Sequence, residues 1–369
     1  MVILTINTGS SSVRLDAFSY EKGDQKRIAS SYFKTRENEP RVLLEAFFRN
    51  NDIKEISLAA HRVVHGGTKF ITSCLITPEV VDEIERLSSL APLHNPYAFA
   101  WIRACGEVCG DEIPQTAIFD TAFYADLPDV AKTYALPKKL CETHKIRRYG
   151  FHGIAHGAMA ARWKELQPDT QGKDRLISLQ LGAGCSITAV KNGKAVDTSM
   201  GFTPLEGLMM ATRPGDLDPG LVSYLIGTAG FTPFEVEKLL NNSSGLLGVS
   251  GVSGDMKALL ASDAPDARFA VELYCYRAKK YIGAYAAALG GIDALLFGGG
   301  IGENAPVIRR KILDGMQWCG IEIDDGANDI TIGKEGLIST RNSGIDVWVI
   351  PVDEAGVLAE EAVKVVTCL

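Results

Sequence analysis

The sequence, 369 residues long, has few of the features that mark secreted or membrane proteins. Its 8 cysteines are too sparse for a disulfide framework, and the close pair Cys105 and Cys109 fits neither a zinc ribbon nor a redox Cys-x-x-Cys motif. The most apolar window, 281–301, is interrupted by Gly290 and Gly291, which disfavours a membrane span, and no basic region marks a signal peptide. We therefore expect a cytoplasmic protein with buried, reduced thiols and no membrane partner.

A concentrated excess of one charge is also absent. The 38 Lys and Arg residues are scattered among 45 Asp and Glu residues, which gives a net charge of −7 and no basic surface for a nucleic acid. The Walker A sequence and the Rossmann Gly-x-Gly-x-x-Gly spacing are missing, so two common nucleotide-binding folds are disfavoured. His152 and His156 are four residues apart, but the Glu of a His-Glu-x-x-His zinc motif is missing. The hydrophobic fraction of 46% is typical of a globular protein with large cores.

What the sequence does contain is a set of three glycine-rich turns, each directly after an apolar, strand-like segment. Glycine lets backbone N–H groups turn toward a ligand and lets that ligand approach closely. The set therefore suggests several backbone cradles around one polyphosphate, although each turn taken alone is better explained as an ordinary strand connection. The turns span residues 7–12, 182–186 and 298–304, after the segments 2–6, 176–181 and 294–297.

The first two turns are predicted to join the strands of hairpins. Residues 13–18 largely alternate between apolar and polar, and 186–190 lead through the turn signal Asn192-Gly193 into another strand. This repeated unit predicts a duplicated α/β architecture with a cleft between related halves. The third turn precedes Pro306, which a helix accepts at its first position, so a strand, a loop and a helix N-terminus form a site suited to an anion.

Three further segments organise the rest of the chain. A long helix is predicted over about 266–289, with a stripe of apolar and aromatic residues that belongs in the core. A polar loop is predicted over 164–174, and a boundary between lobes between about 120 and 175. The C-terminal residues 357–366 are predicted to form a helix that caps the fold.

Several polar residues lie in unusually apolar or glycine-rich surroundings, where chemistry is an alternative to ordinary structural roles. An arginine is commonly a surface residue, a lone histidine commonly bonds within the fold, and an acid at a helix start can be an N-cap. Taken together, two arginines, a histidine, acids and phosphate-type loops suit phosphoryl transfer, in which catalysis is mostly positioning and electrostatic stabilisation. The candidates are Arg62, Asp120, His152, Arg213, Asp353 and Glu354.

A series of motifs in matching order and spacing covers nearly the whole chain. They lie at 7–12, 61–67, 90–96, 119–123, 148–153, 197–210, 243–248 and 300–304. On these motifs the sequence resembles the acetate kinase family of short-chain acyl kinases, within the actin, Hsp70 and sugar-kinase superfamily. The resemblance implies a two-lobed, duplicated α/β fold with an interlobe active-site cleft. The expected lobes are residues 1–124 with 355–369, and residues 125–354.

The resemblance also implies the reaction ATP + acetate ⇌ ADP + acetyl phosphate, dependent on Mg²⁺ with Mn²⁺ as an alternative, by direct in-line transfer. Acetate is already ionised at pH 7, so this reaction needs no general base. The implied partners are these small molecules, and the implied assembly is a homodimer formed through the C-terminal lobe.

The family's site residues carry over by position. Arg62 and Arg213 would hold the substrate carboxylate and the transferring phosphoryl group, and His152 would steady its equatorial oxygens. Asp120 and Glu354 would act at or near Mg²⁺, with support to the metal and phosphates from Asn7, Ser10, Ser12 and Arg14. The nucleotide residues would be Arg14, Gly182, Ala183, Gly184, Asp255, Met256, Lys257, Gly300, Ile301, Gly302, Asn304 and Ile308. The acyl methyl group would be held by Val64, Leu93, Phe151 and Pro204.

The chain departs from the family pattern at several positions. The family's His-Leu-Gly-Asn-Gly is here Gln180-Leu181-Gly182-Ala183-Gly184, which removes a side-chain donor to the phosphates. Lysine replaces arginine at 257 and cannot stack a planar guanidinium on a base. Asp353 replaces an asparagine, and the segment before His61 is shorter than is usual. Three alternatives stay open: a propionate or other short-chain acyl kinase, a kinase with pyrophosphate as donor, and a non-catalytic nucleotide-binding protein.

Overall fold

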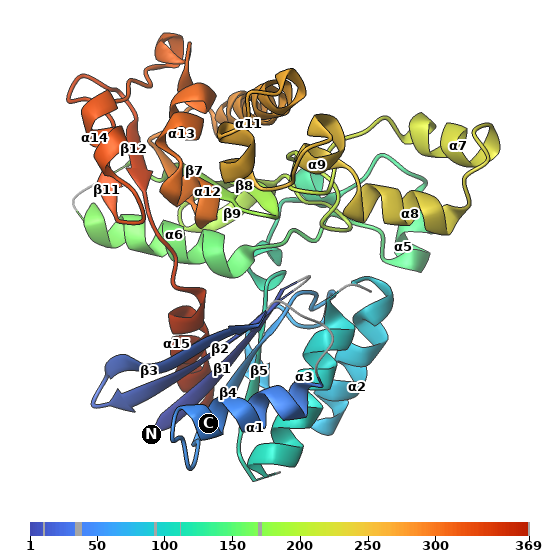
Figure 1. The fold of residues 1–369 in the computed structure, drawn as a ribbon, viewed down its shortest axis with the longest axis vertical. Helices are drawn as coiled ribbons and strands as arrows, with labels where there is room; N and C mark the ends of the chain where they lie inside the picture. The colour runs from blue at the N-terminus through green and yellow to red at the C-terminus, as the bar shows by residue number, and fades with distance from the viewer. Residues whose placement is uncertain (10–11, 34–38, 92–93, 111, 169–171, 368–369) are drawn as a thin grey trace. The chain divides into compact units, whose positions relative to one another are not determined.

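The computed structural model describes residues 1–9, 12–33, 39–91, 94–110, 112–168 and 172–367 (Figure 1). The chain forms two compact units. Unit 1 comprises residues 1–125, 151–154 and 353–369, and unit 2 comprises residues 126–150 and 155–352. Compared with the expected lobes, unit 1 gains Ala125, the short stretch 151–154 and the two acidic residues Asp353 and Glu354.

Unit 1 is built on a 6-stranded sheet of order β3-β2-β1-β4-β6-β5. Its first three strands form an antiparallel meander, β4 and β6 add in parallel to β1, and β5 pairs antiparallel at the edge. The strands are β1 Val2–Thr8, β2 Val13–Glu21, β3 Asp24–Phe33, β4 Leu58–Val63, β5 Cys74–Leu75 and β6 Gln115–Phe119.

Unit 2 repeats this plan in a sheet of order β11-β12-β10-β7-β8-β9. Here β7, β8 and β9 form the meander, β10 and β12 add in parallel to β7, and β11 is the antiparallel edge. The predicted hairpins around the first two glycine turns and the predicted duplication are therefore confirmed. The strands are β7 Arg175–Leu181, β8 Cys185–Lys191, β9 Lys194–Thr198, β10 Ala294–Gly298, β11 Gly336–Leu337 and β12 Asp346–Val349.

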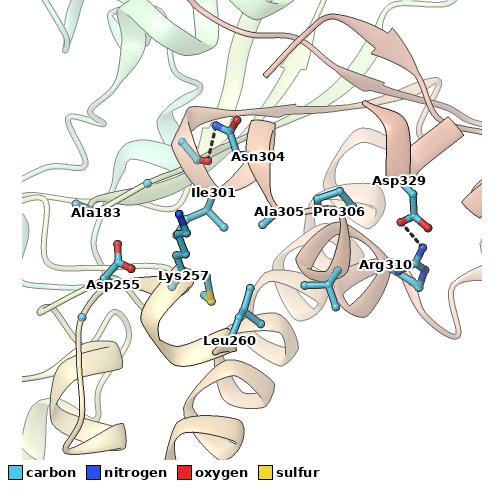
Figure 2. Close-up of a pocket in the computed structure, with 15 residues that line it drawn as sticks. Ala183, Asp255, Lys257, Leu260, Ile301, Asn304, Ala305, Pro306, Arg310 and Asp329 are labelled. Carbon is cyan, nitrogen blue, oxygen red and sulfur yellow. Dashed lines mark hydrogen bonds and ion pairs between the residues drawn. The ribbon is translucent and has the colours of Figure 1, made fainter. Parts of the chain in front are cut away.

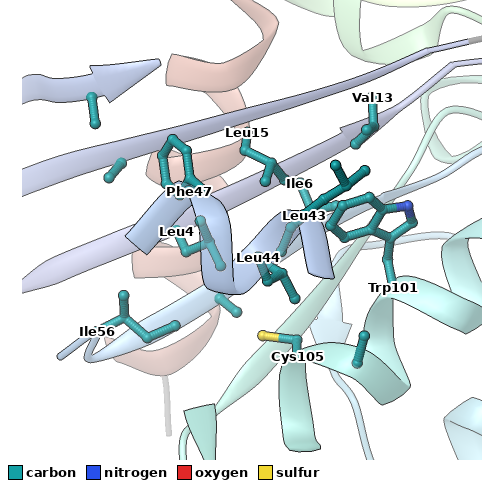
Figure 3. Close-up of a cluster of buried hydrophobic side chains, with 14 residues drawn as sticks. Leu4, Ile6, Val13, Leu15, Leu43, Leu44, Phe47, Ile56, Trp101 and Cys105 are labelled. Carbon is teal, nitrogen blue, oxygen red and sulfur yellow. The ribbon is translucent and has the colours of Figure 1, made fainter. Parts of the chain in front are cut away.

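Helices cover both faces of the first sheet. Because successive side chains of a strand point to opposite faces, Leu4 and Ile6 of β1 pack against the α1–α3 side (Figure 3), whereas Ile3 packs against α15. On the first side, Phe47 and Trp101 complete the buried cluster. The helices of unit 1 are α1 Pro40–Asn50, α2 Pro78–Arg86, η1 Leu87–Ser89, α3 Asn95–Cys109, η2 Ala122–Tyr124 and α15 Glu354–Thr367.

The second sheet is contacted on its two faces by α6 and α11. His156 of α6 bonds to Ser178 of β7 and Ser186 of β8, and the hydroxyl of Tyr274 in α11 lies 3.3 Å from the Cys185 thiol. Helix α6, Gly153–Leu166, begins in unit 1, and the others are α4 Asp129–Lys132, α5 Lys138–His144, α7 Pro219–Gly227, α8 Pro233–Asn242, α9 Gly245–Ser250, α10 Met256–Leu260, α11 Pro265–Leu289, α12 Gly299–Asn304, α13 Pro306–Leu313, η3 Gln317–Cys319 and α14 Asp325–Ile330.

The long helix predicted near 266–289 and the C-terminal helix are confirmed as α11 and α15, but two predictions were wrong. Residues 164–166, expected in a loop, form the last turn of α6, because their helix-favouring side chains continue it. The third glycine turn is the helix α12 rather than a loop. No helix in the described part of the chain is long and apolar enough to cross a membrane.

Candidate active site

Four predicted site residues gather in unit 1 at the carboxyl ends of its parallel strands. Asn7 lies near the end of β1, Arg62 lies in β4, and Asp120 directly follows β6. Glu354 is the first residue of α15. Because β1, β4 and β6 run parallel and adjacent, their carboxyl ends meet at one edge, where ligands of open α/β sheets commonly bind.

The Arg62 guanidinium is the centre of this cluster. Its Nη2 donates to Asp120 Oδ2 at 2.6 Å, its Nη1 donates to Asn7 Oδ1 at 3.0 Å, and the same Nη1 lies 3.7 Å from Glu354 Oε2. Asn7 Nδ2 in turn donates to Glu354 Oε2 at 2.8 Å. Each of the four side chains is therefore oriented by another member of the cluster.

Burial and charge act against each other in the pair of Arg62 and Asp120. Burial lowers the pKa of Arg62, but the carboxylates of Asp120 and Glu354 outweigh it, so the pKa is raised overall. The Asp120 side chain is only 1% exposed, and burial raises its pKa while the Arg62 charge opposes that rise. The positive charge of Arg62 is thus neutralised by the neighbouring carboxylates of Asp120 and Glu354.

His152 lies in a strained turn against the same cluster. Its φ of 58° is in the left-handed region, which is uncommon for a residue with a side chain and often accompanies a functional site. The backbone N–H of His152 favours the ionised form of Asp120, and Gly153 N donates to Asp120 O at 3.1 Å. A Cβ at Gly153 would lie 2.0 Å from that oxygen, so glycine is required there. The turn brings His152 next to Asp120.

The residues expected around the acyl methyl group divide between the units. Val64 and Phe151 are buried in unit 1, and the ring of His65 makes an edge contact with Phe151 at 5.7 Å between centroids. Pro204 lies in unit 2. Leu93 lies outside the described residues, as does Ser10 of the first glycine turn.

Two of the remaining predicted residues of the first turn have partners elsewhere in unit 1. Arg14 pairs with Asp16 at 3.0 Å and bonds to Ser30, so its side chain is directed along the β2–β3 meander. The carbonyl of Ser12 accepts from Gly9 N at 2.8 Å, which closes the turn on itself. Neither residue contributes to the cavity of unit 2 described next.

Unit 2 contains a cavity of about 780 Å³ between α10, the second glycine turn and the α12–α13 segment (Figure 2). Its size falls in the range of small-molecule and cofactor sites. The predicted nucleotide residues that line it are Gly182, Ala183, Asp255, Met256, Lys257, Gly300, Ile301 and Asn304.

Not every predicted nucleotide residue lines the cavity. Gly302 and Ile308 are buried, and Gly184 lies in the second turn but outside the lining. Residues that sequence reasoning missed include Leu260, Arg310 and Asp329, which come from three separate helices or their ends. The sequence contains one indication of such residues. Pro306 predicts a helix that starts directly after the third glycine turn, so residues of that helix had to lie near the turn.

Helix α12 approaches β7 more closely than a side chain would allow. Gly299 has a φ of 76°, and a Cβ on it would lie 2.6 Å from the Leu181 carbonyl oxygen. Glu303 Oε1 accepts from Gly299 N at 2.9 Å, and Asn304 Nδ2 donates to Gly300 O at 3.0 Å. The third glycine turn thus lies close against β7 and forms one wall of the cavity.

Arg213 lies in a loop joined to the second glycine turn. Ala211 N donates to Ala183 O at 3.0 Å, and Asp216 closes the loop by accepting from Gly207 N at 2.9 Å. The partly buried Arg213 guanidinium donates to Pro204 O at 2.7 Å and forms no ion pair among the described residues. Burial lowers its pKa, and because no carboxylate of the described residues neutralises it, this guanidinium is available to an anionic ligand.

The cluster of unit 1 offers oxygen donors for a metal ion. In the described part of the chain no group of three or more His, Cys, Asp or Glu side chains could hold a metal by itself. Mg²⁺ in kinases is commonly bound by one or two carboxylates together with substrate phosphates and waters. The carboxylate of Glu354 and the amide oxygen of Asn7 fit this pattern.

Comparisons with known proteins agree along the length of the chain. The sequence model of the acetokinase family matches residues 18–360. The chain is 49% identical to the acetate kinase of Solibacter usitatus over 85% of this chain and 76% of that protein. It is 40% identical to the acetate kinase of Caldanaerobacter subterraneus over 99% of both chains.

Solved structures show the same similarity. A crystal structure of Porphyromonas gingivalis acetate kinase superimposes with a TM-score of 0.88 at 37% identity, over 99% of both chains. A propionate kinase from Francisella tularensis gives a TM-score of 0.89 at 35% identity, over 98% of this chain and 99% of that one.

Proposed function

The chain belongs to the acetokinase family, and we propose that it is an acetate kinase that transfers the terminal phosphoryl group of ATP to acetate. The observation that carries this proposal is the cavity of unit 2. It is lined by the second and third glycine turns, and the loop of Arg213 is bonded to the second turn. We expect the reaction in the cytoplasm, with ATP and acetate as the small-molecule partners.

The adenosine part of ATP would lie in the cavity, against the backbone of Gly300 and the side chain of Ile301. The α12 and α10 segments supply short polar groups at its rim, including Asn304 and Asp255. The backbone of Gly182 and Ala183 would face the phosphates, as glycine-rich turns do in other phosphate sites. Arg213, which pairs with no carboxylate of the described residues, would stabilise the charge of the transferring group.

Unit 1 would supply the acetate and metal residues. Arg62 and His152 would orient the acetate carboxylate and the phosphoryl oxygens, and Val64 and Phe151 would contact the methyl group. Because acetate is ionised at neutral pH, no residue needs to remove a proton. The role of Asp120 would be to hold Arg62 in place through their 2.6 Å contact.

Mg²⁺ is the metal that this donor set suits, through Glu354 and Asn7. When bound, it would neutralise phosphate charge that Arg213 alone could not. The chain's own contribution is the orientation of Glu354, which Asn7 fixes with a 2.8 Å hydrogen bond.

Propionate is the alternative acceptor. The similarity to a propionate kinase is nearly as high as that to an acetate kinase, and one extra methylene changes binding by only about 1–3 kcal/mol. A panel of acetate, propionate and butyrate, compared by kcat/KM, distinguishes them. We expect the highest value for acetate, and a higher value for propionate would assign the alternative.

A homodimer is the assembly that the surface of unit 2 supports. Helix α7 has a strongly apolar sequence, yet none of its side chains is buried, and Leu221 and Tyr224 are 42% and 56% exposed. Phe234 of the neighbouring α8 is 72% exposed. Such a patch commonly marks a protein interface. Light scattering should give twice the chain mass, and Tyr224→Glu should reduce it to the monomer mass.

The proposed reaction is tested by trapping its product. The purified protein is incubated with ATP, Mg²⁺, hydroxylamine and each carboxylate, and acyl hydroxamate is measured. We expect hydroxamate that depends on both ATP and acetate. Failure to form it from acetate, propionate and butyrate would reject the kinase and favour the non-catalytic nucleotide-binding alternative.

A further inference from the structure

Arg309 of α13 is a charged side chain without any exposure to solvent. It is among the largest fully buried side chains, and it forms no ion pair with a carboxylate among the described residues. A buried charge is strongly unfavourable unless hydrogen bonds compensate it. The presence of this guanidinium in the interior therefore requires an explanation.

The compensation comes from backbone carbonyls at the ends of two helices. Nη1 donates to the carbonyls of Gly302 at 2.7 Å and Glu303 at 3.1 Å, near the C-terminus of α12. Nη2 donates to the carbonyls of Asn328 at 2.8 Å and Thr331 at 2.7 Å, at the C-terminus of α14, and Nε donates to Asn328 Oδ1 at 2.8 Å. All of these bonds are made by one planar group.

This arrangement suits the charges of helix ends. The last carbonyls of a helix lack partners within it and carry partial negative charge, so a cation there is favourable. Burial lowers the pKa of Arg309 to about 10, which leaves the guanidinium protonated at neutral pH. Since α12 and α14 are each only 6 residues long, neither has much stability of its own.

Arg309 itself does not line the nucleotide cavity, but the elements it joins do. Helix α12 contributes Gly300, Ile301 and Asn304, and α14 contributes Asp329 (Figure 2). Asp329 also accepts a hydrogen bond from Arg310 of α13 at 2.6 Å. The buried guanidinium thus ties two separate parts of the cavity wall together from behind.

We propose that Arg309 is a positioning residue for the nucleotide, because it holds α12 and α14 in the arrangement that shapes the cavity. The inference rests on the proposed function for the identity of the ligand. If α12 were less ordered in the free protein, nucleotide binding would have to order it, and the affinity for the nucleotide would fall. The residues of unit 1 that are proposed to bind acetate would be unchanged. The expected effect is therefore specific to ATP and ADP.

The test compares Arg309→Lys and Arg309→Met with the exposed control Arg341→Lys. Lysine keeps the positive charge but lacks the planar guanidinium with its several N–H donors. Methionine has a side chain of similar length but neither charge nor donors. We expect the KM for ATP and the Kd for ADP to rise by roughly tenfold or more in Arg309→Met, and by less in Arg309→Lys, since bonds to a buried charged group are lost. The KM for acetate and the control variant should stay at wild-type values. Amide hydrogen exchange over 299–304 should become faster in both Arg309 variants.

If Arg309→Met does not fold, Arg309→Lys and Asn328→Ala, which removes one of the acceptors, carry the test. An unchanged KM for ATP and unchanged exchange over 299–304, with only a lower melting temperature and lower kcat, would overturn the positioning role and make Arg309 purely structural. Failure of the proposed function is distinct, because the wild-type protein would then form no acyl phosphate, whether or not it binds ADP.

Discussion

The two catalytic arginine candidates have opposite electrostatic surroundings. Arg62 in unit 1 contacts Asp120 at 2.6 Å and lies near Glu354, so neighbouring carboxylates raise its pKa. Arg213 in unit 2 donates to the carbonyl of Pro204, has no ion pair among the described residues, and has a pKa lowered by burial. The difference indicates that Arg62 is held as an orienting group, whereas Arg213 has charge available for an incoming anion.

The same contrast extends to the two units. Unit 1 gathers side chains that neutralise one another at a sheet edge, which suits a small acyl substrate and a metal ion. Unit 2 offers backbone from glycine turns and a cavity of about 780 Å³, which suits a nucleotide. Substitutions in unit 1 should therefore affect stability and acetate use, and substitutions in unit 2 should affect the donor or the transfer step.

Replacing Arg213 tests the contrast with the largest expected effect. Arg213→Ala should lower kcat by roughly 10²–10³-fold, because a group that stabilises transition-state charge is removed. The Kd for ADP should change little, since Arg213 does not line the cavity. Steady-state kinetics and calorimetry with ADP measure the two quantities. A loss of ADP binding as large as the loss of kcat would show that Arg213 instead shapes the loop.

Breaking the ion pair of unit 1 should mainly affect stability. Asp120→Asn leaves the guanidinium of Arg62 without its closest carboxylate, which should lower the free energy of unfolding by about 3 kcal/mol. Urea unfolding measures it. The matched control is Asp126→Asn, which breaks the exposed 2.8 Å pair with Lys194 and should have no measurable effect. Equal small effects would mean that the Arg62 pair is not a buried, stabilising contact.

Acid should destabilise unit 1 more steeply than unit 2. Burial lowers the pKa of His61 and His65 in unit 1 to about 4, and that of His156 in unit 2 to about 3. Below pH 6.5 the unfolded chain binds protons that these folded histidines exclude. The contribution of these histidines to the free energy of unfolding is therefore fully present above pH 6.5. It is lost as the pH falls toward 4, by about 1.4 kcal/mol per pH unit for each histidine.

Hydrogen exchange at pH 6.5, 5.8 and 5.0, resolved by unit, measures this dependence. His61→Gln should reduce the slope in unit 1, and the exposed control His144→Gln should leave it unchanged. Equal slopes in the two units would contradict the assignment of two buried neutral histidines to unit 1.

Restoring the family's side chain in the second glycine turn has the smallest expected effect. Ala183 is exposed at the cavity, and only its backbone is engaged, by Ala211 N. Ala183→Asn should raise kcat/KM for ATP by about two- to tenfold if the missing donor is a simple loss. Ala183→Val, which adds bulk without a donor, is the control. Unchanged or lower activity with asparagine would show that the site is organised around alanine.

Local patterns allowed much of this structure to be predicted. The hairpins around the first two glycine turns follow from alternation and the Asn192-Gly193 signal. Arg62 was a candidate because it lies beside a tight glycine turn, and Asp120 and Glu354 because they follow strand-like segments. These features depend on neighbours in the sequence, so a single chain reveals them.

Long-range packing was beyond local patterns. The third turn is helical and Gly299 packs closely against Leu181 of β7, a contact that nothing near 299 in the sequence indicates. Similarly, Val307 rather than Ile308 lines the cavity, because the packing of α13 sets the face it presents. The buried role of Arg309 depends on carbonyls 19 and 22 residues away in sequence.

Phosphorus NMR of the wild-type protein with ATP, Mg²⁺ and acetate tests the central claim most directly. If unit 2 binds the donor and Arg213 assists direct transfer to acetate, resonances of acetyl phosphate and ADP should grow together, and neither should grow when acetate is omitted. Formation of ADP with inorganic phosphate alone, or the absence of any acyl phosphate from acetate, propionate and butyrate, would contradict the account.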